Sequence, residues 1–359
     1  MAMNINTLLL ELLRKQGSDL LVATGHRPTY RIHGRLHQTD HPETTLEEAQ
    51  LALDMVLSEQ DAERLAVEQN QDFAYQVDLP GFGPRRFRGN AFYQRHGPSL
   101  VLRAIPIEIP TTSVLGLPQE ITRLMDFHQG LLLVTGPTGS GKTTTLAALI
   151  DYVNKSRPLH VITIEDPVEF VHPIKQCMVV QRQVGTHVIN FSSALRAALR
   201  EDPDVILVGE LRDLETMSLA ITASETGHLV LGTLNTVSAS QTVNRIINVF
   251  PASQQSQIRT MLGDSLRGVI SQQLVPRLDG KGRAVAVEVM INTGAIGSMI
   301  RDAKMHQINS AIQTGHRYGM RLMDQSLVEL VERAIVAGQD ALDLAHDKSS
   351  FARIVGGVV

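Results

Sequence analysis

Residues 130–150, GLLLVTGPTGSGKTTTLAALI, constrain the fold of this chain more than any other stretch. An apolar run precedes a glycine-rich loop and a helical pattern follows it, which is the usual setting of the phosphate-binding pattern G-x-x-x-x-G-K-[ST]. In such a loop the glycines let backbone N–H groups converge on phosphate oxygens, and the helix presents its positive end to them. A fortuitous glycine-rich turn is disfavoured because both flanking segments also fit. The sequence therefore predicts a site for nucleotide phosphates.

The pattern also assigns tasks to single residues of this loop. Lys142 is expected to reach the β- and γ-phosphates, and the Thr143 hydroxyl is expected to bind Mg²⁺. The predicted nucleotide-binding residues of the loop are Gly136, Pro137, Thr138, Gly139, Ser140, Gly141, Lys142, Thr143 and Thr144.

The chain around and after this loop alternates between strand and helix patterns. Compact runs rich in β-branched residues predict strands buried on both faces of a parallel sheet, at 130–136, 160–166, 204–210 and 228–234. Helices are predicted at 142–153, 191–200 and 213–225. An extra hairpin is expected at 176–185, and helices from 253 onward with one hairpin around 278–282. The last twelve residues, KSSFARIVGGVV, have little to bury and are expected to fray.

The first 105 residues have a different pattern, that of an α+β module. The predicted elements are a helix at 5–16 closed by Gly17, a half-buried strand at 28–39, a helix at 49–66 preceded by a capping box from Thr45 to Glu48, and three strands within 72–106. Proline and threonine then replace periodic apolar spacing at 106–118, which predicts a linker. A length of 359 residues also favours two domains.

Acidic residues follow two of the predicted buried strands. Glu165 and Asp166 end one strand, and Glu210 ends another. The carboxyl ends of parallel strands meet at the edge of the sheet where ligands bind, so these acids are expected beside the phosphate loop. Hydrolysis of a bound triphosphate needs one group near Mg²⁺ and one that orients water. The residues alone supply both candidates without assigning the two roles.

Four segments together resemble a known family. GPTGSGKTTT, ITIEDPVEF, ALREDPDVILVGELRD and ASETGHLVLGTLNT follow the order and spacing of the signature boxes of the type II/type IV secretion ATPases. Within that superfamily the chain is similar to the type IV pilus retraction motors that power twitching motility. The similarity extends from GSDLLVATGHRPTYRIHGRL near the N-terminus to about residue 345.

The resemblance implies an α/β fold and a division of the chain. The implied parts are a PAS-like N-terminal α+β domain at 1–105, a linker at 106–118, a RecA-like P-loop ATPase domain with C-terminal helices at 119–345, and a flexible tail at 346–359. It implies ATP and Mg²⁺ as ligands and a ring of six subunits. By the family's motifs, Glu210 takes the Walker B position near Mg²⁺ and Glu165 takes the position of the glutamate that activates water.

Arginines that stabilise the transferring phosphoryl group often come from another domain or subunit. Five arginines lie within RRFRGNAFYQRHGPSLVLR, and a solvated sheet face is the plain alternative for such a run. Arg88 and Arg103 match family positions that contact a neighbouring nucleotide. Arg196 and Arg200, four residues apart, are second candidates.

Two stretches match the family only in part. His228 is carried over as a nucleotide-site residue, with a core histidine as the alternative, but Asn235 stands where these motors usually have a second histidine. Asparagine stays neutral and offers one donor end and one acceptor end, so sensing of the γ-phosphate by this box is in question. Residues 294–304, GAIGSMIRDAK, occupy the place of a retraction helix, although core packing explains their apolar spacing equally well.

Composition and charge argue against two kinds of site. The net charge of −4 provides no sequence-wide basic field for nucleic acid, which leaves room only for a local basic patch, and Cys177, the single cysteine, excludes a four-cysteine zinc site. No signal peptide or membrane span is predicted, so a cytoplasmic protein is expected, peripheral at the inner membrane through the pilus machine. The expected partners are five further copies in a homohexamer, an inner-membrane platform protein and a paralogous retraction ATPase.

These features predict a hexameric ATPase that drives pilus retraction. A pilus extension or type II secretion ATPase is the nearest alternative, although such proteins commonly carry a longer N-terminal region and a zinc site. A RecA-like ring that moves along nucleic acid and a non-hydrolysing accessory subunit are the more distant ones.

Overall fold

The computed structural model describes residues 4–32, 34–105 and 108–356 of the chain. Its internal contacts divide the chain into two compact units, residues 1–108 and 109–359.

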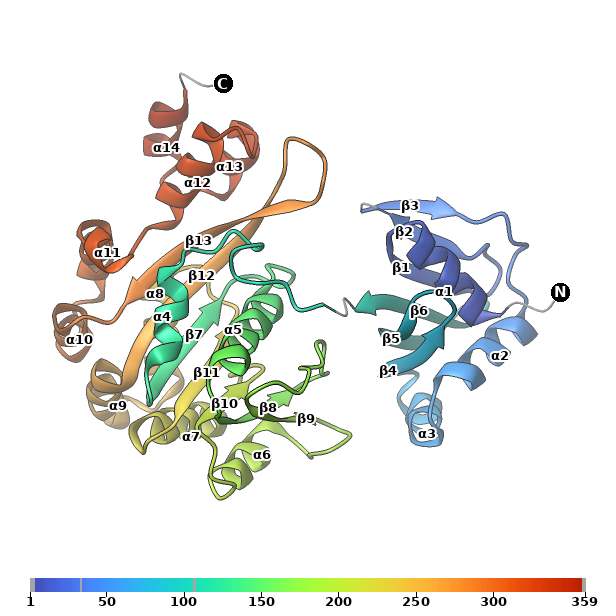
Figure 1. The fold of residues 1–359 in the computed structure, drawn as a ribbon, viewed down its shortest axis with the longest axis horizontal. Coiled ribbons are helices and arrows are strands. Elements are labelled where there is room, and N and C mark those ends of the chain that lie inside the picture. Colours follow the sequence, from blue (N-terminus) through green and yellow to red (C-terminus); the bar gives the residue numbers. More distant parts are fainter. Residues whose placement is uncertain (1–3, 33, 106–107, 357–359) are drawn as a thin grey trace. The chain divides into compact units, whose positions relative to one another are not determined.

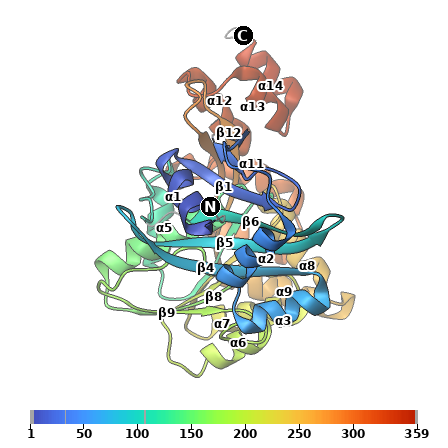
Figure 2. The same cartoon turned by 90° about the vertical axis from the view of Figure 1, so that its right-hand side faces the viewer.

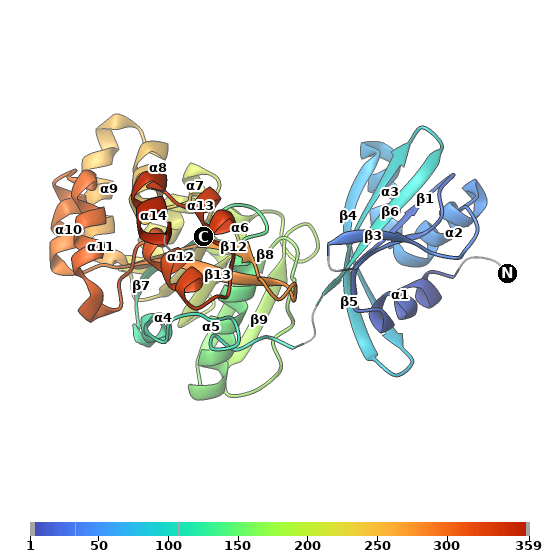
Figure 3. The ribbon, with the colours of Figure 1, turned by 90° about the horizontal axis from the view of Figure 1, so that it is seen from above.

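The N-terminal unit is a six-stranded antiparallel sheet with three helices on one face (Figure 3). Its strands, in the order β3-β2-β1-β6-β5-β4, are β1 (Gly17–Ala23), β2 (Thr29–Ile32), β3 (Arg35–Gln38), β4 (Asn70–Leu79), β5 (Gly83–Gln94) and β6 (Gly97–Ile105). The helices are α1 (Ile5–Arg14), α2 (Leu46–Val56) and α3 (Glu59–Glu68). Leu8, Leu53 and Phe87 belong to the apolar core between helices and sheet.

The second unit is built on a seven-stranded sheet (Figure 1). Its strand order is β13-β12-β7-β11-β10-β8-β9, and only β13 runs antiparallel to its neighbour. The strands are β7 (Gly130–Thr135), β8 (His160–Glu165), β9 (Met178–Gln183), β10 (Val205–Val208), β11 (Leu229–Leu234), β12 (Leu266–Pro276) and β13 (Arg283–Ile291).

Helices flank this sheet and extend beyond its last strand. They are α4 (Glu120–Arg123), α5 (Lys142–Ser156), α6 (Phe191–Ala198), α7 (Leu214–Glu225), α8 (Ala239–Val249), α9 (Ala252–Ser265), α10 (Gly294–Arg301), α11 (Ile308–Thr314), α12 (Met323–Glu332), α13 (Gly338–Leu344) and α14 (Lys348–Val355). Three short 3-10 helices are η1 (Leu124–Asp126), η2 (Met305–Gln307) and η3 (His316–Tyr318).

The central strands are buried on both faces of this sheet. Along β7, Leu131 and Leu133 pack into one apolar core, whereas Leu132 and Val134 pack into a second core on the opposite face. Successive side chains of a strand point to opposite faces, so a strand covered on both sides must be apolar throughout. This explains why the strands read as continuous apolar runs, and it confirms the predicted parallel α/β architecture.

The C-terminal helices pack against the hairpin formed by β12 and β13. Figure 2 shows α12, α13 and α14 gathered beside the C-terminus. Glu288 of β13 is almost completely buried, and it accepts the backbone N–H of Ala239 at 2.7 Å and that of Met323 at 3.4 Å. These are the first residues of α8 and α12, so one carboxylate serves the N-termini of two helices. Burial raises the pKa of Glu288, and the two backbone hydrogen bonds oppose that shift.

Helix α10 lies against α9 at a very close approach. A Cβ added to Gly297 would meet the carbonyl oxygen of Gly263 at 2.8 Å, so the small residues allow the contact. Ile300 is fully buried in the core, whereas Arg301 is exposed and forms an ion pair with Asp264 at 2.7 Å. Core packing therefore accounts for Ile296, Met299 and Ile300, whereas Ala295 is exposed.

Three predicted elements of the N-terminal unit differ in the structure. The first helix ends at Arg14, and Gly17 begins β1 instead of closing the helix. The stretch 28–39 is a hairpin of β2 and β3 rather than one strand. The capping box from Thr45 to Glu48 is confirmed, but the helix that follows it breaks, and Ser58 caps a second helix.

The second unit also differs from the sequence expectations at two places. Residues 178–183 form β9, a parallel edge strand, rather than a hairpin. The tail was expected to fray, yet its residues up to 355 form α14, because Phe351 is a large apolar anchor with only 1% of its surface exposed. The unit boundary falls between Glu108 and Ile109, and Leu117, within the expected linker, already packs into a core of the second unit. The expected linker residues 106 and 107 lie outside the described residues.

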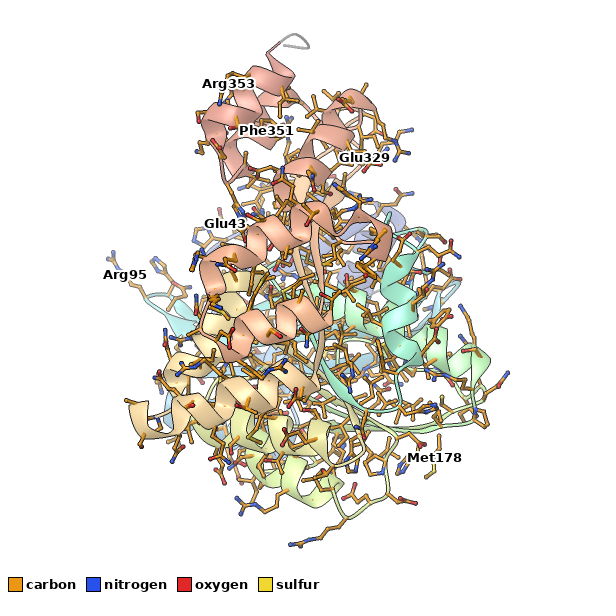
Figure 4. All side chains as sticks on the ribbon, turned by 90° about the vertical axis from the view of Figure 1, so that its left-hand side faces the viewer. Glu43, Arg95, Met178, Glu329, Phe351 and Arg353 are labelled. Carbon is orange, nitrogen blue, oxygen red and sulfur yellow. The ribbon has the colours of Figure 1, made fainter. Side chains whose placement is uncertain are left out.

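We predict that Phe351→Ala destabilises the second unit by about 3–5 kcal/mol, since it removes a buried aromatic side chain. Ile354→Ala on the same helix is the control, because 60% of the Ile354 surface is exposed. The two labelled residues Phe351 and Arg353 mark this helix in Figure 4. Thermal unfolding of both variants tests the prediction, and equal midpoints would contradict it.

Candidate nucleotide site

The glycine-rich loop leaves the carboxyl end of β7, which pairs in parallel with β11 on one side and β12 on the other. Gly136 has a φ of +145°, and a Cβ there would meet the carbonyl oxygen of Gln272 at 2.3 Å, so only glycine fits. Gly141 is the N-cap residue of α5 and provides no side chain to cap the helix. The first N–H groups of α5 therefore have neither an intrahelical acceptor nor a capping side chain.

The loop residues fit a phosphate group. The Ser140 hydroxyl is buried and has no hydrogen-bond partner among the described residues. The Ser140 carbonyl accepts the Gln272 side-chain amide at 2.6 Å, which ties the loop to β12. An unpaired hydroxyl and the free amide ends of a helix start are donors of the kind that phosphate oxygens accept. These donors support the predicted nucleotide site at residues 136–144.

The ammonium group of Lys142 lies across this loop. It donates to the carbonyl oxygens of Gly136 at 2.8 Å and Pro137 at 3.1 Å, and to Oδ1 of Asn235 at 2.9 Å. Burial lowers the pKa of Lys142, and the negative charge of Glu210 opposes this shift. The lysine is thus placed at the loop, beside the acid that follows β10.

Glu210 lies two residues beyond the end of β10 and is half-buried. Oε1 accepts the Asn235 amide at 3.0 Å, and Oε2 pairs with Arg212 at 2.7 Å. The hydrogen bond from Arg212 to Glu210 raises the pKa of the guanidinium. Mg²⁺ is usually held by one or two protein groups together with phosphates and water, so Glu210 and the Thr143 hydroxyl are a suitable donor set.

Glu165, the last residue of β8, has a different environment. Only 8% of its surface is exposed, and Oε1 accepts the Thr163 hydroxyl at 2.7 Å and the Gln181 amide at 3.1 Å. Burial raises the pKa of Glu165, and these hydrogen bonds partly oppose the shift. No cationic side chain is among its partners in the described residues. A carboxylate with a raised pKa is suited to accept a proton.

Sequence reasoning missed Gln181 and Gln272. Gln181 pairs with Thr163 in the register of β8 and β9, so the two side chains reach Glu165 from neighbouring strands. The expected hairpin at 176–185 concealed this pairing. Gln272 lies in a strand that is buried along most of its length. A polar residue in such a strand was the available signal, because a buried polar side chain usually has a specific partner.

The structure places His228 away from this site, which corrects the expectation. His228 precedes β11, and its carbonyl oxygen accepts the N–H of Gly130 at the start of β7. The loop lies at the other end of these six-residue strands, roughly 20 Å away at about 3.3 Å per residue. The imidazole Nδ1 is 3.2 Å from the carbonyl oxygen of Ala223, so it contacts the end of α7. His228 therefore lies outside the nucleotide site formed by this chain.

The arginine candidates fall into two groups. Arg88 and Arg103 lie directly opposite each other on β5 and β6, and Asp19 lies opposite Arg103 on β1. The side chain of Asp19 is 5% exposed and accepts Nε of Arg103 at 2.8 Å, while two thirds of the Arg103 side chain remains exposed. Arg88 is 3.7 Å from a carboxylate oxygen of Asp72.

The second group, Arg196 and Arg200, was expected on one face of a helix, and the structure differs. Arg196 forms an ion pair with Glu215. Arg200 follows the end of α6, so the two arginines do not share one helical face.

A sequence profile described as "Type II/IV secretion system protein" matches residues 1–299. The chain belongs to this family. It is 45% identical to the type IV pilus retraction ATPase PilT of Pseudomonas aeruginosa over 346 residues, which is 96% of this chain and 99% of that protein. It is 45% identical to a twitching motility protein of Neisseria gonorrhoeae over 325 residues, 90% of this chain and 86% of that protein.

A solved structure of the secretion system family matches the fold. The crystal structure of the pilus retraction motor PilT with bound ADP has a TM-score of 0.90 and 43% identity, and covers 98% of this chain and 99% of that one. The predicted fold class, an N-terminal α+β domain followed by a P-loop ATPase domain, is thereby confirmed.

We predict that Gly136→Ala abolishes measurable nucleotide binding, because the new methyl group would collide with the Gln272 backbone and force the loop out of place. Gly282→Ala is the matched control, since Gly282 also has a positive φ, +89°, but no atom lies within 4 Å of its added Cβ and it belongs to the β12–β13 turn. Titration calorimetry with Mg²⁺ and ADP compares the two. Similar affinities would show that the close approach at Gly136 is not required.

Proposed function

We propose that this chain is an ATP-hydrolysing motor that drives type IV pilus retraction. The observation that carries the proposal is the edge of the second sheet, where the loop, Lys142 and Glu210 are joined by hydrogen bonds and Glu165 ends the strand next to β10. Family membership and full-length similarity to a retraction ATPase support the choice of reaction and process.

The residues divide the chemistry between them. The loop amides and Lys142 bind the phosphates, and Glu210 with Thr143 would hold Mg²⁺, which would supply positive charge to the phosphate oxygens. Glu165 orients the attacking water and takes its proton, because its carboxylate is buried among neutral donors with a raised pKa. The different environments of the two glutamates support these different roles.

The arginines of the N-terminal unit are proposed to act across a subunit boundary. Asp19 holds Arg103 by Nε, so the two terminal nitrogens of the guanidinium remain available to a phosphate. Arg88, opposite Arg103 in the sheet, would add a second charge. A ring of six copies would bring such a pair to a neighbour's nucleotide, and sedimentation at several concentrations tests the assembly.

The proposed cellular setting is peripheral. None of the helices in the described ranges is long and apolar enough to cross a bilayer. We propose that the motor acts from the cytoplasm on an inner-membrane platform protein of the pilus machine, together with a paralogous retraction ATPase.

The alternatives have weaker support. An extension or secretion ATPase would share the loop and both glutamates, but the relative matched over 99% of its length is a retraction ATPase. A ring moving along nucleic acid is disfavoured by the net charge of −4, and salt-dependent DNA binding would reveal it.

We predict that Glu165→Gln keeps nucleotide binding and lowers turnover by about 10² or more, because the amide cannot accept the proton. Burial raises the pKa of Glu165, so the wild-type rate should fall as the pH is lowered, with an apparent pKa above the ordinary 4.5. Glu201→Gln, which changes an exposed carboxylate paired with Arg182, is the control. ATPase assays from about pH 5 to 8 test both statements, because histidine and carboxyl groups with a raised pKa titrate in about this range. Near-normal turnover in Glu165→Gln would remove its role.

We predict that a cell without this protein still assembles pili but cannot withdraw them, because only the disassembly motor is missing. Surface pili should be normal or more numerous, and twitching should be lost. Electron microscopy and a surface motility assay measure these effects. Bald cells would instead favour extension, and unchanged piliation and motility would indicate a redundant paralogue.

A further inference from the structure

Asn235 connects two oppositely charged groups of the nucleotide site. Its Oδ1 accepts Nζ of Lys142 at 2.9 Å, and its Nδ2 donates to Oε1 of Glu210 at 3.0 Å. An ammonium group can only donate and a carboxylate can only accept, so the charges fix the orientation of the amide. We call these three residues the Lys142–Asn235–Glu210 bridge.

The backbone around Asn235 is held on both sides. The carbonyl oxygen of Leu234 accepts the N–H of Gly136, the first residue of the loop, at 3.3 Å. The carbonyl oxygen of Thr233 accepts the N–H of Leu211 at 3.0 Å, and its hydroxyl donates to the carbonyl of Gly209. The end of β11 is therefore fastened to the loop and to the segment that carries Glu210. Asn235 extends from a rigid support and not from a mobile loop.

The donors of Lys142 are all engaged within the chain. An ammonium group has three N–H donors, and two of them go to backbone carbonyls of the loop itself. The third goes to the exposed side chain of Asn235. A phosphate oxygen that binds Lys142 must replace one of these acceptors. The amide oxygen is the one that can leave by a side-chain rotation without rebuilding the loop.

We propose that Asn235 is a positioning residue that sets Lys142 and Glu210 relative to each other, and that its amide oxygen is the acceptor that a nucleotide phosphate replaces on Lys142. This inference rests on the proposed nucleotide site. The neutral amide accepts a hydrogen bond from Lys142 and donates one to Glu210. A charged imidazolium could not do both, because it has no acceptor for Lys142. Asn235 competes with phosphate for the lysine and also orients the glutamate.

Two substitutions separate these effects. Asn235→Leu removes the competing acceptor and the donor to Glu210, so the Kd for Mg²⁺ and ADP should fall about threefold to tenfold while kcat for ATP falls about tenfold. Asn235→Asp keeps the acceptor, strengthens it with a negative charge and repels Glu210, so Kd should rise about tenfold. Opposite changes in Kd, with turnover reduced in the leucine variant, are the expected signature. A residue with a merely structural role would weaken both binding and turnover.

Asn244→Leu is the matched control, because it replaces an exposed asparagine on α8 by the same residue and should change neither constant. Calorimetry measures Kd, a phosphate-release assay measures kcat, and thermal unfolding checks that each variant folds. If the leucine variant does not fold, the near-isosteric aspartate variant decides alone, and an unchanged or lower Kd in it overturns the inference. Shifts of both Kd values in one direction also overturn it. If Kd is lower than wild type in Asn235→Leu and higher in Asn235→Asp, but the wild-type protein hydrolyses no ATP, the proposed motor activity is rejected and the role of Asn235 in binding stands.

Discussion

The parallel register of β7, β11, β10 and β8 is the constraint on which the nucleotide site depends. Each of these strands is buried on both faces, and residues from Leu229 to Leu234 pair one for one with residues from Gly130 to Thr135. Because the strands end together, segments far apart in the chain emerge at one edge. A slip of one residue would turn every apolar side chain to the opposite core and move the loop away from Asn235. The packing of two cores thus fixes the geometry of a polar site that contributes little to either.

The two glutamates at this edge differ in how their charge is accommodated. Glu210 forms an ion pair with Arg212, and its negative charge opposes the lowering of the Lys142 pKa. Glu165 receives only neutral donors and is almost completely buried, so ionisation is costly. Two carboxylates in different environments, one paired with a cation and one surrounded by neutral donors, are a common basis for separate roles in one reaction. Strand ends alone could not distinguish them, since both follow similar apolar runs.

Features encoded by local pattern could be predicted from the sequence, and features that depend on distant pairing could not. The loop, the central strands and the capping box at Thr45 follow from spacing and residue type within short segments. The contact of Gln181 with Glu165 depends on how β9 pairs, and the anchoring of α14 depends on a pocket for Phe351 built from other helices. The family motif alone suggested His228 as a nucleotide-site residue. The direction of β11 places it at the end of that strand away from the loop. The strand pattern at 28–39 likewise did not reveal that the chain turns at Gly34 between β2 and β3.

The shared carboxylate of Glu288 has a mechanical consequence. The segment from Asn235 to Ser238 joins the nucleotide edge to α8, whose first amide is bound by Glu288, and the other oxygen of that carboxylate binds the first amide of α12. If α8 alone were displaced, the buried carboxyl group of Glu288 would lose its shorter hydrogen bond, which is costly in a nonpolar environment. The least expensive displacement moves the strand β13 and both helix ends together. A displacement of the segment from Asn235 to Ser238 would therefore reach the start of α12 through a single buried side chain of β13.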